Sequence, residues 1–137
     1  MTVPDAPIPP AALGLLGQAR HALLEAMSTP DPLQRYATAH LAALRATAAL
    51  LAVRTRPVRR KGGPRNAWDL LAQIAPELRE WAAYFSAGAG KRAAAEAGLR
   101  SAVTAREADD LVRDAELFVA AIAATLEQPH QALLAHG

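Results

Sequence analysis

The sequence contains no cysteine among its 137 residues. A chain without cysteine has no disulfide framework, no thiolate metal ligand and no thiol nucleophile. Aromatic residues are also scarce, at 4%, although 52% of the residues are hydrophobic. Alanine makes up much of that hydrophobic fraction. We therefore predict a core in which helices pack closely through small side chains.

Sequence features of membrane and metal-binding proteins are lacking too. No apolar run approaches the roughly 20 residues of a membrane span, and the start MTVPDAPIPP has no basic or apolar signal-peptide region. His21 has no acidic or histidine partner at ligand spacing, metal binding by His130 and His136 in the expected tail has no support, and the acidic residues after Thr104 have no calcium loop. We therefore expect a cytoplasmic protein with no membrane contact, no metal and no cofactor.

Helical patterns fill most of the chain, and no stretch alternates with the period of a strand. The patterns predict helices over residues 11–27, 32–53, 66–85 and 105–128. Asp31 with Gln34, and Thr104 with Glu107, have the spacing of capping boxes at two helix starts. Pro76 predicts a break after Ala75, and residues 91–97 predict a short extra helix.

These elements predict an all-α protein, an antiparallel up-down four-helix bundle with a short extra helix between helices three and four. We expect residues 1–10 to be a disordered N-terminal segment, 11–128 to form the bundle domain and 129–137 to be a flexible tail. The core stripe of the last helix is predicted from its three-to-four spacing. Its residues are Ala108, Leu111, Val112, Ala115, Phe118, Val119, Ile122 and Leu126.

Two helix halves are apolar on every side, LFVAAIAATL in the last helix and ATAALLAV in the second. Such a segment is either centrally buried or covered by a partner. Because a four-helix bundle has no central helix, we interpret both as the interface of a homodimer. The alternative is that these faces, which are rich in alanine, are hydrophobic so weakly that they can be exposed to water without a partner.

Positive charge is concentrated in one segment. Residues 54–65, RTRPVRRKGGPR, carry six positive charges and no acidic residue, whereas residues 104–137 carry two basic and six acidic residues. Arginine forks suit phosphate groups, so this segment is a candidate site for RNA, DNA or another anion. Its basic residues are Arg54, Arg56, Arg59, Arg60, Lys61 and Arg65. A solvated loop, or docking to an acidic protein partner, are the alternatives.

The segments RYATAHLAALRATAALLAVRTRP, RNAWDLLAQIAPELREWAAYF and VTAREADDLVRDAELF resemble a family of small actinobacterial proteins in the HEPN superfamily. The resemblance covers roughly residues 12–127 and implies a four-helix bundle, usually dimeric and often linked to RNA or nucleotides. Many superfamily members are ribonucleases that use an arginine and a histidine with four to six residues between them, in a cleft between protomers.

Only Arg35 and His40 match that ribonuclease spacing here, and Tyr36 follows the arginine where a polar residue is common. At Arg65 a polar residue, Asn66, does follow the arginine as in the superfamily motif, but no histidine follows at the required distance. Five residues turn a helix by roughly 140°, so Arg35 and His40 diverge within one chain. The predicted core stripe is Leu33, Ala37, His40, Leu41, Leu44, Ala48 and Leu51. Arg35 and His40 are therefore either a composite catalytic pair completed by a second protomer, or a surface arginine and a buried histidine.

We interpret the protein as a dimeric HEPN-like binding or regulatory module rather than an enzyme, one that contacts nucleic acid or another polyanion through residues 54–65. One alternative is a metal-independent endoribonuclease with a composite site. Another is a protein-interaction adaptor that does not bind nucleic acid.

Overall fold

The computed structural model describes residues 8–54 and 66–136, with side chains up to residue 127. The described residues form helices joined by turns, with no strand among them. Its elements are α1 (Pro10–Met27), α2 (Pro32–Arg54), α3 (Ala67–Ile74), the 3-10 turn η1 (Pro76–Leu78), α4 (Arg79–Ala87), α5 (Ala89–Glu96) and α6 (Ala105–His136). The all-α class predicted from the sequence is thus confirmed.

Local signals set most helix boundaries. The Asp31 carboxylate accepts the backbone N–H of Leu33 at the start of α2. Thr104 and Glu107 bond each other's backbone N–H groups, so the capping box predicted at the start of α6 is present. Ala75, which precedes Pro76, leaves the helical region with φ −128° and ψ 77°, and the predicted break separates α3 from α4.

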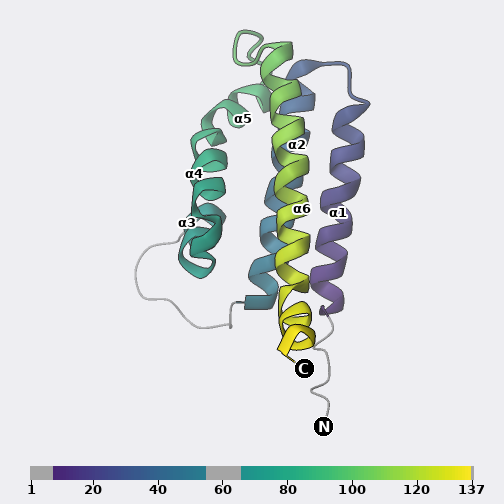
Figure 1. Cartoon of the computed structure of the whole chain (residues 1–137). Helices are drawn as coiled ribbons and strands as arrows, with labels where there is room; N and C mark the ends of the chain where they lie inside the picture. The colour runs from purple at the N-terminus through teal and green to yellow at the C-terminus, as the bar shows by residue number, and fades with distance from the viewer. Residues whose placement is uncertain (1–7, 55–65, 137) are drawn as a thin grey trace.

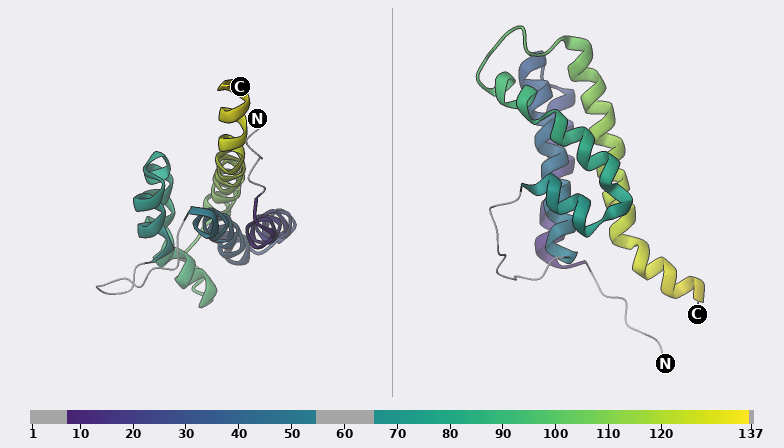
Figure 2. Two further views of the ribbon diagram at one scale, coloured as in Figure 1. Left: turned by 90° about the horizontal axis from the view of Figure 1, so that it is seen from below. Right: turned by 90° about the vertical axis from the view of Figure 1, so that its left-hand side faces the viewer.

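The helices form two groups. α1, α2 and α6 run side by side, while α3, α4 and α5 form a bent limb along α2 (Figures 1 and 2). The third long helix expected from the sequence is therefore divided into short segments. α5 ends at Glu96, and two residues later Gly98, with a φ of +81°, gives the chain a left-handed stop before the turn into α6.

Helix α2 is the central helix of the fold. It packs against α1, α3, α5 and α6, and its buried residues lie on several sides. The core stripe predicted for it is wrong in part, because Leu41, Leu44, Ala48 and Leu51 are only half-buried. Small residues occupy the close helix contacts instead, and Ala39, Ala43 and Ala46 are fully buried.

This central position accounts for the apolar character of α2. By length and composition α2 would also pass as a membrane span, but 56% of its most apolar window is buried within the protein. The premise that the fold has no central helix was wrong, so the apolar half of α2 is no argument for a dimer interface. The apolar half of α6 is still an argument for a dimer interface, because Leu117, Ala120 and Ala124 are exposed there.

The core stripe predicted for α6 is confirmed, since all eight of its residues are buried. It faces an aromatic cluster in which Phe118 contacts Phe85, Trp68 and Trp81 at centroid distances of 4.9, 6.3 and 5.5 Å. The backbone of α6 is helical to His136, beyond residue 128, where we expected the helix to end and a tail to begin. A proline removes one helical hydrogen bond, and at Pro129 that loss does not end the helix.

Candidate functional site

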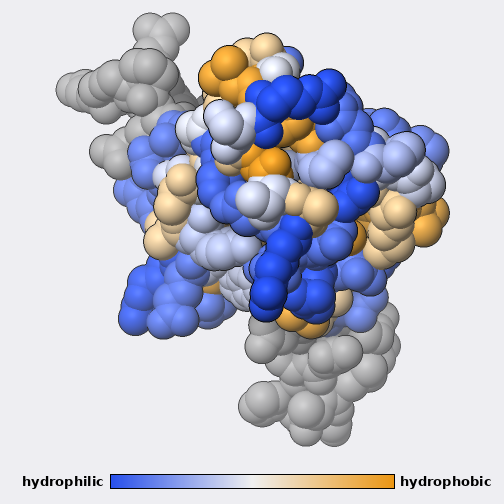
Figure 3. All heavy atoms as spheres, turned by 90° about the horizontal axis from the view of Figure 1, so that it is seen from above, coloured by the Kyte–Doolittle hydropathy of each residue, from blue (hydrophilic) through white to orange (hydrophobic). Residues whose placement is uncertain are grey.

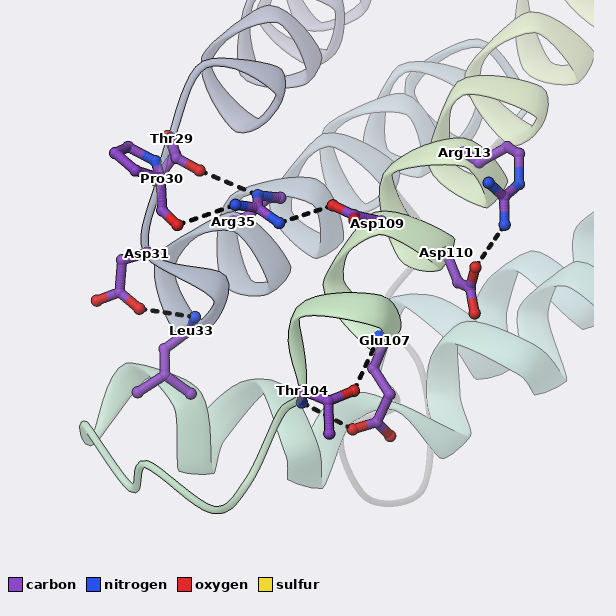
Figure 4. Close-up of polar contacts among 10 residues, drawn as sticks. All are labelled: Thr29, Pro30, Asp31, Leu33, Arg35, Thr104, Glu107, Asp109, Asp110 and Arg113. Atoms are coloured by element: carbon purple, nitrogen blue, oxygen red, sulfur yellow. Dashed lines mark hydrogen bonds and ion pairs between the residues drawn. The ribbon is translucent and has the colours of Figure 1, made fainter.

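Arg35 joins three segments of the protein near the start of α2 (Figure 4). Its Nε donates to the Thr29 carbonyl at 3.0 Å, and its Nη2 donates to the Pro30 carbonyl at 2.9 Å. Its Nη1 forms an ion pair with Asp109 of α6 at 2.6 Å. The side chain is only 17% exposed. All three guanidinium nitrogens therefore have partners within the fold. Together these bonds hold the α1–α2 turn against α6.

His40 is buried, as predicted, with 1% of its surface exposed. Its Nε2 lies 2.9 Å from the Phe85 carbonyl, which can only accept, so Nε2 carries the proton. The rings of Trp68 and Phe85 meet the imidazole edge to face at 5.5 and 5.9 Å. Burial lowers the pKa of His40, with a smaller opposing effect from the bond to Phe85, and the ring is neutral at pH 7.

The two residues that match the ribonuclease spacing thus have separate surroundings. Arg35 bonds the turn before α2 and the first half of α6, whereas His40 bonds α4 and packs against aromatic rings. They share no partner among the described residues. Within one protomer they do not form a cooperating acid–base pair.

Most of the basic segment lies outside the described residues. This applies to Arg56, Arg59, Arg60, Lys61 and Arg65. Arg54, the last residue of α2, forms an ion pair with Glu77 of η1 at 3.1 Å. Asn66, directly after the segment, caps α3 by accepting the backbone N–H of Asp69. The structure therefore fixes the two positions from which the basic segment leaves and re-enters the fold.

A cleft of about 310 Å³ opens where α2, α4, α5 and α6 meet. Two residues of α2 line it, together with the end of α4, α5 and the first half of α6. The lining residues are Tyr36, His40, Tyr84, Phe85, Ala87, Gly88, Lys91, Glu107, Asp110 and Leu111. The absence of a side chain at Gly88 matters here. A Cβ at that position would stand 2.8 Å from the Tyr36 hydroxyl, inside van der Waals contact.

Ion pairs surround the mouth of this cleft. Lys91 bonds Glu107, and Arg113 bonds Asp110. The bond to Glu107 raises the pKa of Lys91, and the bond from Lys91 lowers the pKa of Glu107. Tyr84 donates to Asp114 at 2.5 Å beside the same cleft. The cleft is therefore polar at its mouth and aromatic at its base.

Among the described residues, no group of three or more histidine or acidic side chains is placed to hold a metal ion.

The end of the molecule at which α5 leads into α6 is mostly hydrophilic (Figure 3). Hydrophobic residues form only separated spots on that face (Figure 3). Nothing on it indicates a broad apolar docking surface.

Sequence reasoning missed this cleft. From the sequence, Arg35 and His40 were considered only for their spacing, and residues 91–97 only as a short extra helix. The useful signal was the pair Tyr36 and His40, which are four residues apart and share one helix face. Gly88 and Lys91 reach that face only because α5 packs against α2.

Residues 26–123, most of the chain, match the sequence model of a HEPN-like family. No curated protein and no solved structure matches the chain.

Proposed function

The chain belongs to the HEPN family, and from that premise we propose that it is a small cytoplasmic binding or regulatory module. It contacts nucleic acid or another polyanion through residues 54–65 and does not cleave RNA. We further interpret α3 to α5 as the third member of an antiparallel four-helix bundle, and the working form as a homodimer.

The observation that carries this proposal is that Arg35 and His40 are both bonded to other groups of the fold. All three guanidinium nitrogens of Arg35 are bonded, and His40 is 1% exposed with Nε2 bonded to Phe85. A general acid or base must reach the proton it transfers, whereas His40 is almost fully buried and its Nε2 already donates to the Phe85 carbonyl. The pair that would make the protein a ribonuclease therefore stabilises the fold instead.

Charge supports the binding role. Six of the fifteen basic residues fall within residues 54–65, where there is no acidic residue. A cluster of this kind attracts phosphates with little sequence preference, and each phosphate contact adds to the salt dependence of binding. In a homodimer the two copies of the segment would together bring twelve positive charges to one ligand.

The test is fluorescence anisotropy with labelled RNA and DNA, from low to physiological salt. We expect both to bind, and affinity to fall steeply with salt. The variant Arg59→Ala/Arg60→Ala/Lys61→Ala should reduce the log–log salt slope by up to about three units, roughly one per lost contact. The matched control is Arg20→Ala/Arg79→Ala/Arg106→Ala, which removes the same charge from exposed helix positions.

Two results would contradict the proposal. If the two triple variants bind equally well, or the wild type does not bind at low salt, residues 54–65 are not the nucleic-acid site and an adaptor role gains support. If the wild type cleaves the RNA, with or without magnesium, and His40→Ala abolishes cleavage at unchanged melting temperature, the composite ribonuclease is the correct function.

A further inference from the structure

The outer side of α6 leaves a leucine and two alanines open to solvent. Leu117 is 57% exposed, and Ala120 and Ala124 are exposed beside it. In Figure 1 α6 lies in front of α2, with α1 on one side and α4 on the other, and no described helix covers its outer side. This side can therefore contact another molecule without any rearrangement of the fold.

Two residues of opposite charge flank this apolar side at equal distances. Arg113 and Glu127 stand seven residues before and seven residues after Ala120, and both are exposed. Seven residues advance a helix by roughly 10.5 Å and return to within roughly 20° of the same direction. Arg113, Ala120 and Glu127 therefore lie along one line on α6, with a positive charge at one end and a negative charge at the other.

This line is complementary to a second copy of itself that runs in the reverse direction. A twofold axis beside Ala120 places Arg113 level with Glu127 of the partner subunit, and the same pairing recurs in the other half. The axis also places Leu117, three residues before Ala120, beside the partner's Ala124, four residues after it. The exposed leucine thus meets a small side chain, and alanine at the centre lets the two helices approach closely.

We propose that the protein dimerises through α6 in this antiparallel register. Two ion pairs between Arg113 and Glu127 of the partner subunit close the ends of the contact. Arg113 already bonds Asp110 through Nη2, and its guanidinium has further donors for a second carboxylate. Glu116 lies on the opposite edge of this side from Leu117, where its long side chain reaches solvent. The inference rests on the homodimer of the proposed function and adds which helix forms it and in which direction.

The first experiment is sedimentation equilibrium of the full chain with reversed charges. Arg113→Glu or Glu127→Arg alone sets like charges opposite each other twice, and should weaken the dimer by about ten- to thirtyfold. The double variant Arg113→Glu/Glu127→Arg restores both pairs with exchanged signs and should associate nearly as tightly as the wild type. The matched controls, Arg79→Glu and Glu80→Arg, reverse the same charges at exposed positions of α4 and should associate like the wild type.

The second experiment uses disulfide crosslinking, which is possible because the chain contains no cysteine. Leu117→Cys/Ala124→Cys should give a covalent dimer under mild oxidation. Either single variant should not, because equivalent positions lie roughly 9 Å or more apart along the helix axis in this register, beyond the reach of a disulfide. A parallel dimer would show the reverse, with crosslinking of the single variants.

The outcomes distinguish this inference from the proposed function. A wild-type dimer that neither single reversal weakens, a double variant that does not recover, or crosslinked single variants would overturn the register and leave the homodimer in place. A monomeric wild type would overturn both, and would leave the outer side of α6 to a different partner or to solvent. If Arg113→Glu melts early, because it sets a second carboxylate beside Asp110, Glu127→Arg and the crosslinks decide the result.

Discussion

Arg35 of α2 and Asp109 of α6 form an ion pair at 2.6 Å across the end of the fold where α1 turns into α2. The same guanidinium also bonds the carbonyls of Thr29 and Pro30, so one side chain holds the turn and two helices together. The arginine that the ribonuclease spacing singles out thus has all three guanidinium nitrogens bonded within the fold.

We expect Arg35→Ala to lower stability by about 1 to 3 kcal/mol, because two carbonyls and a carboxylate lose a charged donor. Asp109→Asn should cost less, about 0 to 1 kcal/mol, since its carboxylate is 63% exposed and solvent replaces the partner. Urea unfolding followed by circular dichroism measures both. Equal losses in the two variants would show that the carbonyl bonds contribute nothing.

The stability of the protein should fall in mild acid because of His40. Burial lowers the pKa of folded His40, so the unfolded chain takes up the proton first. The contribution of neutral His40 is complete above the unfolded value of about 6.5 and is lost as the pH falls below it, by at most about 1.4 kcal/mol per pH unit.

Melting temperatures between pH 8 and pH 5 test this pH dependence. His40→Gln keeps a donor for the Phe85 carbonyl but does not titrate, so its melting temperature should change less with pH than that of the wild type. His21→Gln, at an exposed position of α1, is the control and should follow the wild type. A wild-type slope retained in His40→Gln would assign the pH dependence to other groups.

Gly88 should resist substitution, because an alanine Cβ would meet the Tyr36 hydroxyl at 2.8 Å. We expect Gly88→Ala to cost about 1 to 3 kcal/mol through overpacking, and Tyr36→Phe to recover part of that cost in the double variant. Gly90→Ala is the control in α5. Nothing lies within 4 Å of its new methyl group, and it should stabilise by about 0.5 to 1 kcal/mol. Additive effects of Gly88→Ala and Tyr36→Phe would show that the two residues do not compete for space.

Association should depend on the exposed apolar side of α6. We expect light scattering at micromolar concentration to give twice the 14.4 kDa mass of the chain. Ala120→Glu or Ala121→Glu should produce a monomer if this side is the interface, whereas Ala93→Glu, exposed on α5, should remain dimeric. A wild-type mass of one chain would remove the homodimer from the proposed function.

Several features were readable in the sequence because they depend on neighbouring residues alone. The break at Pro76, the Thr104–Glu107 capping box and the buried stripe of α6 follow from local geometry and periodicity, and all three are present. The burial of His40 was also predicted correctly, although the core stripe used to predict it was right only in part. The stripe failed where α2 is covered on more sides than the bundle assumed.

The sequence by itself therefore determined the helical class, the principal helix starts and the concentration of positive charge in residues 54–65, since each depends on residue type and short-range spacing. Only the tertiary structure decided which groups Arg35 and His40 contact and where the polar cleft lies. Arg35 finds Asp109 seventy-four residues away, and Tyr36 finds Gly88 across the contact between α2 and α5. Such pairings depend on how helices pack, and helix packing is set by all the buried surfaces together rather than by any one stretch of chain.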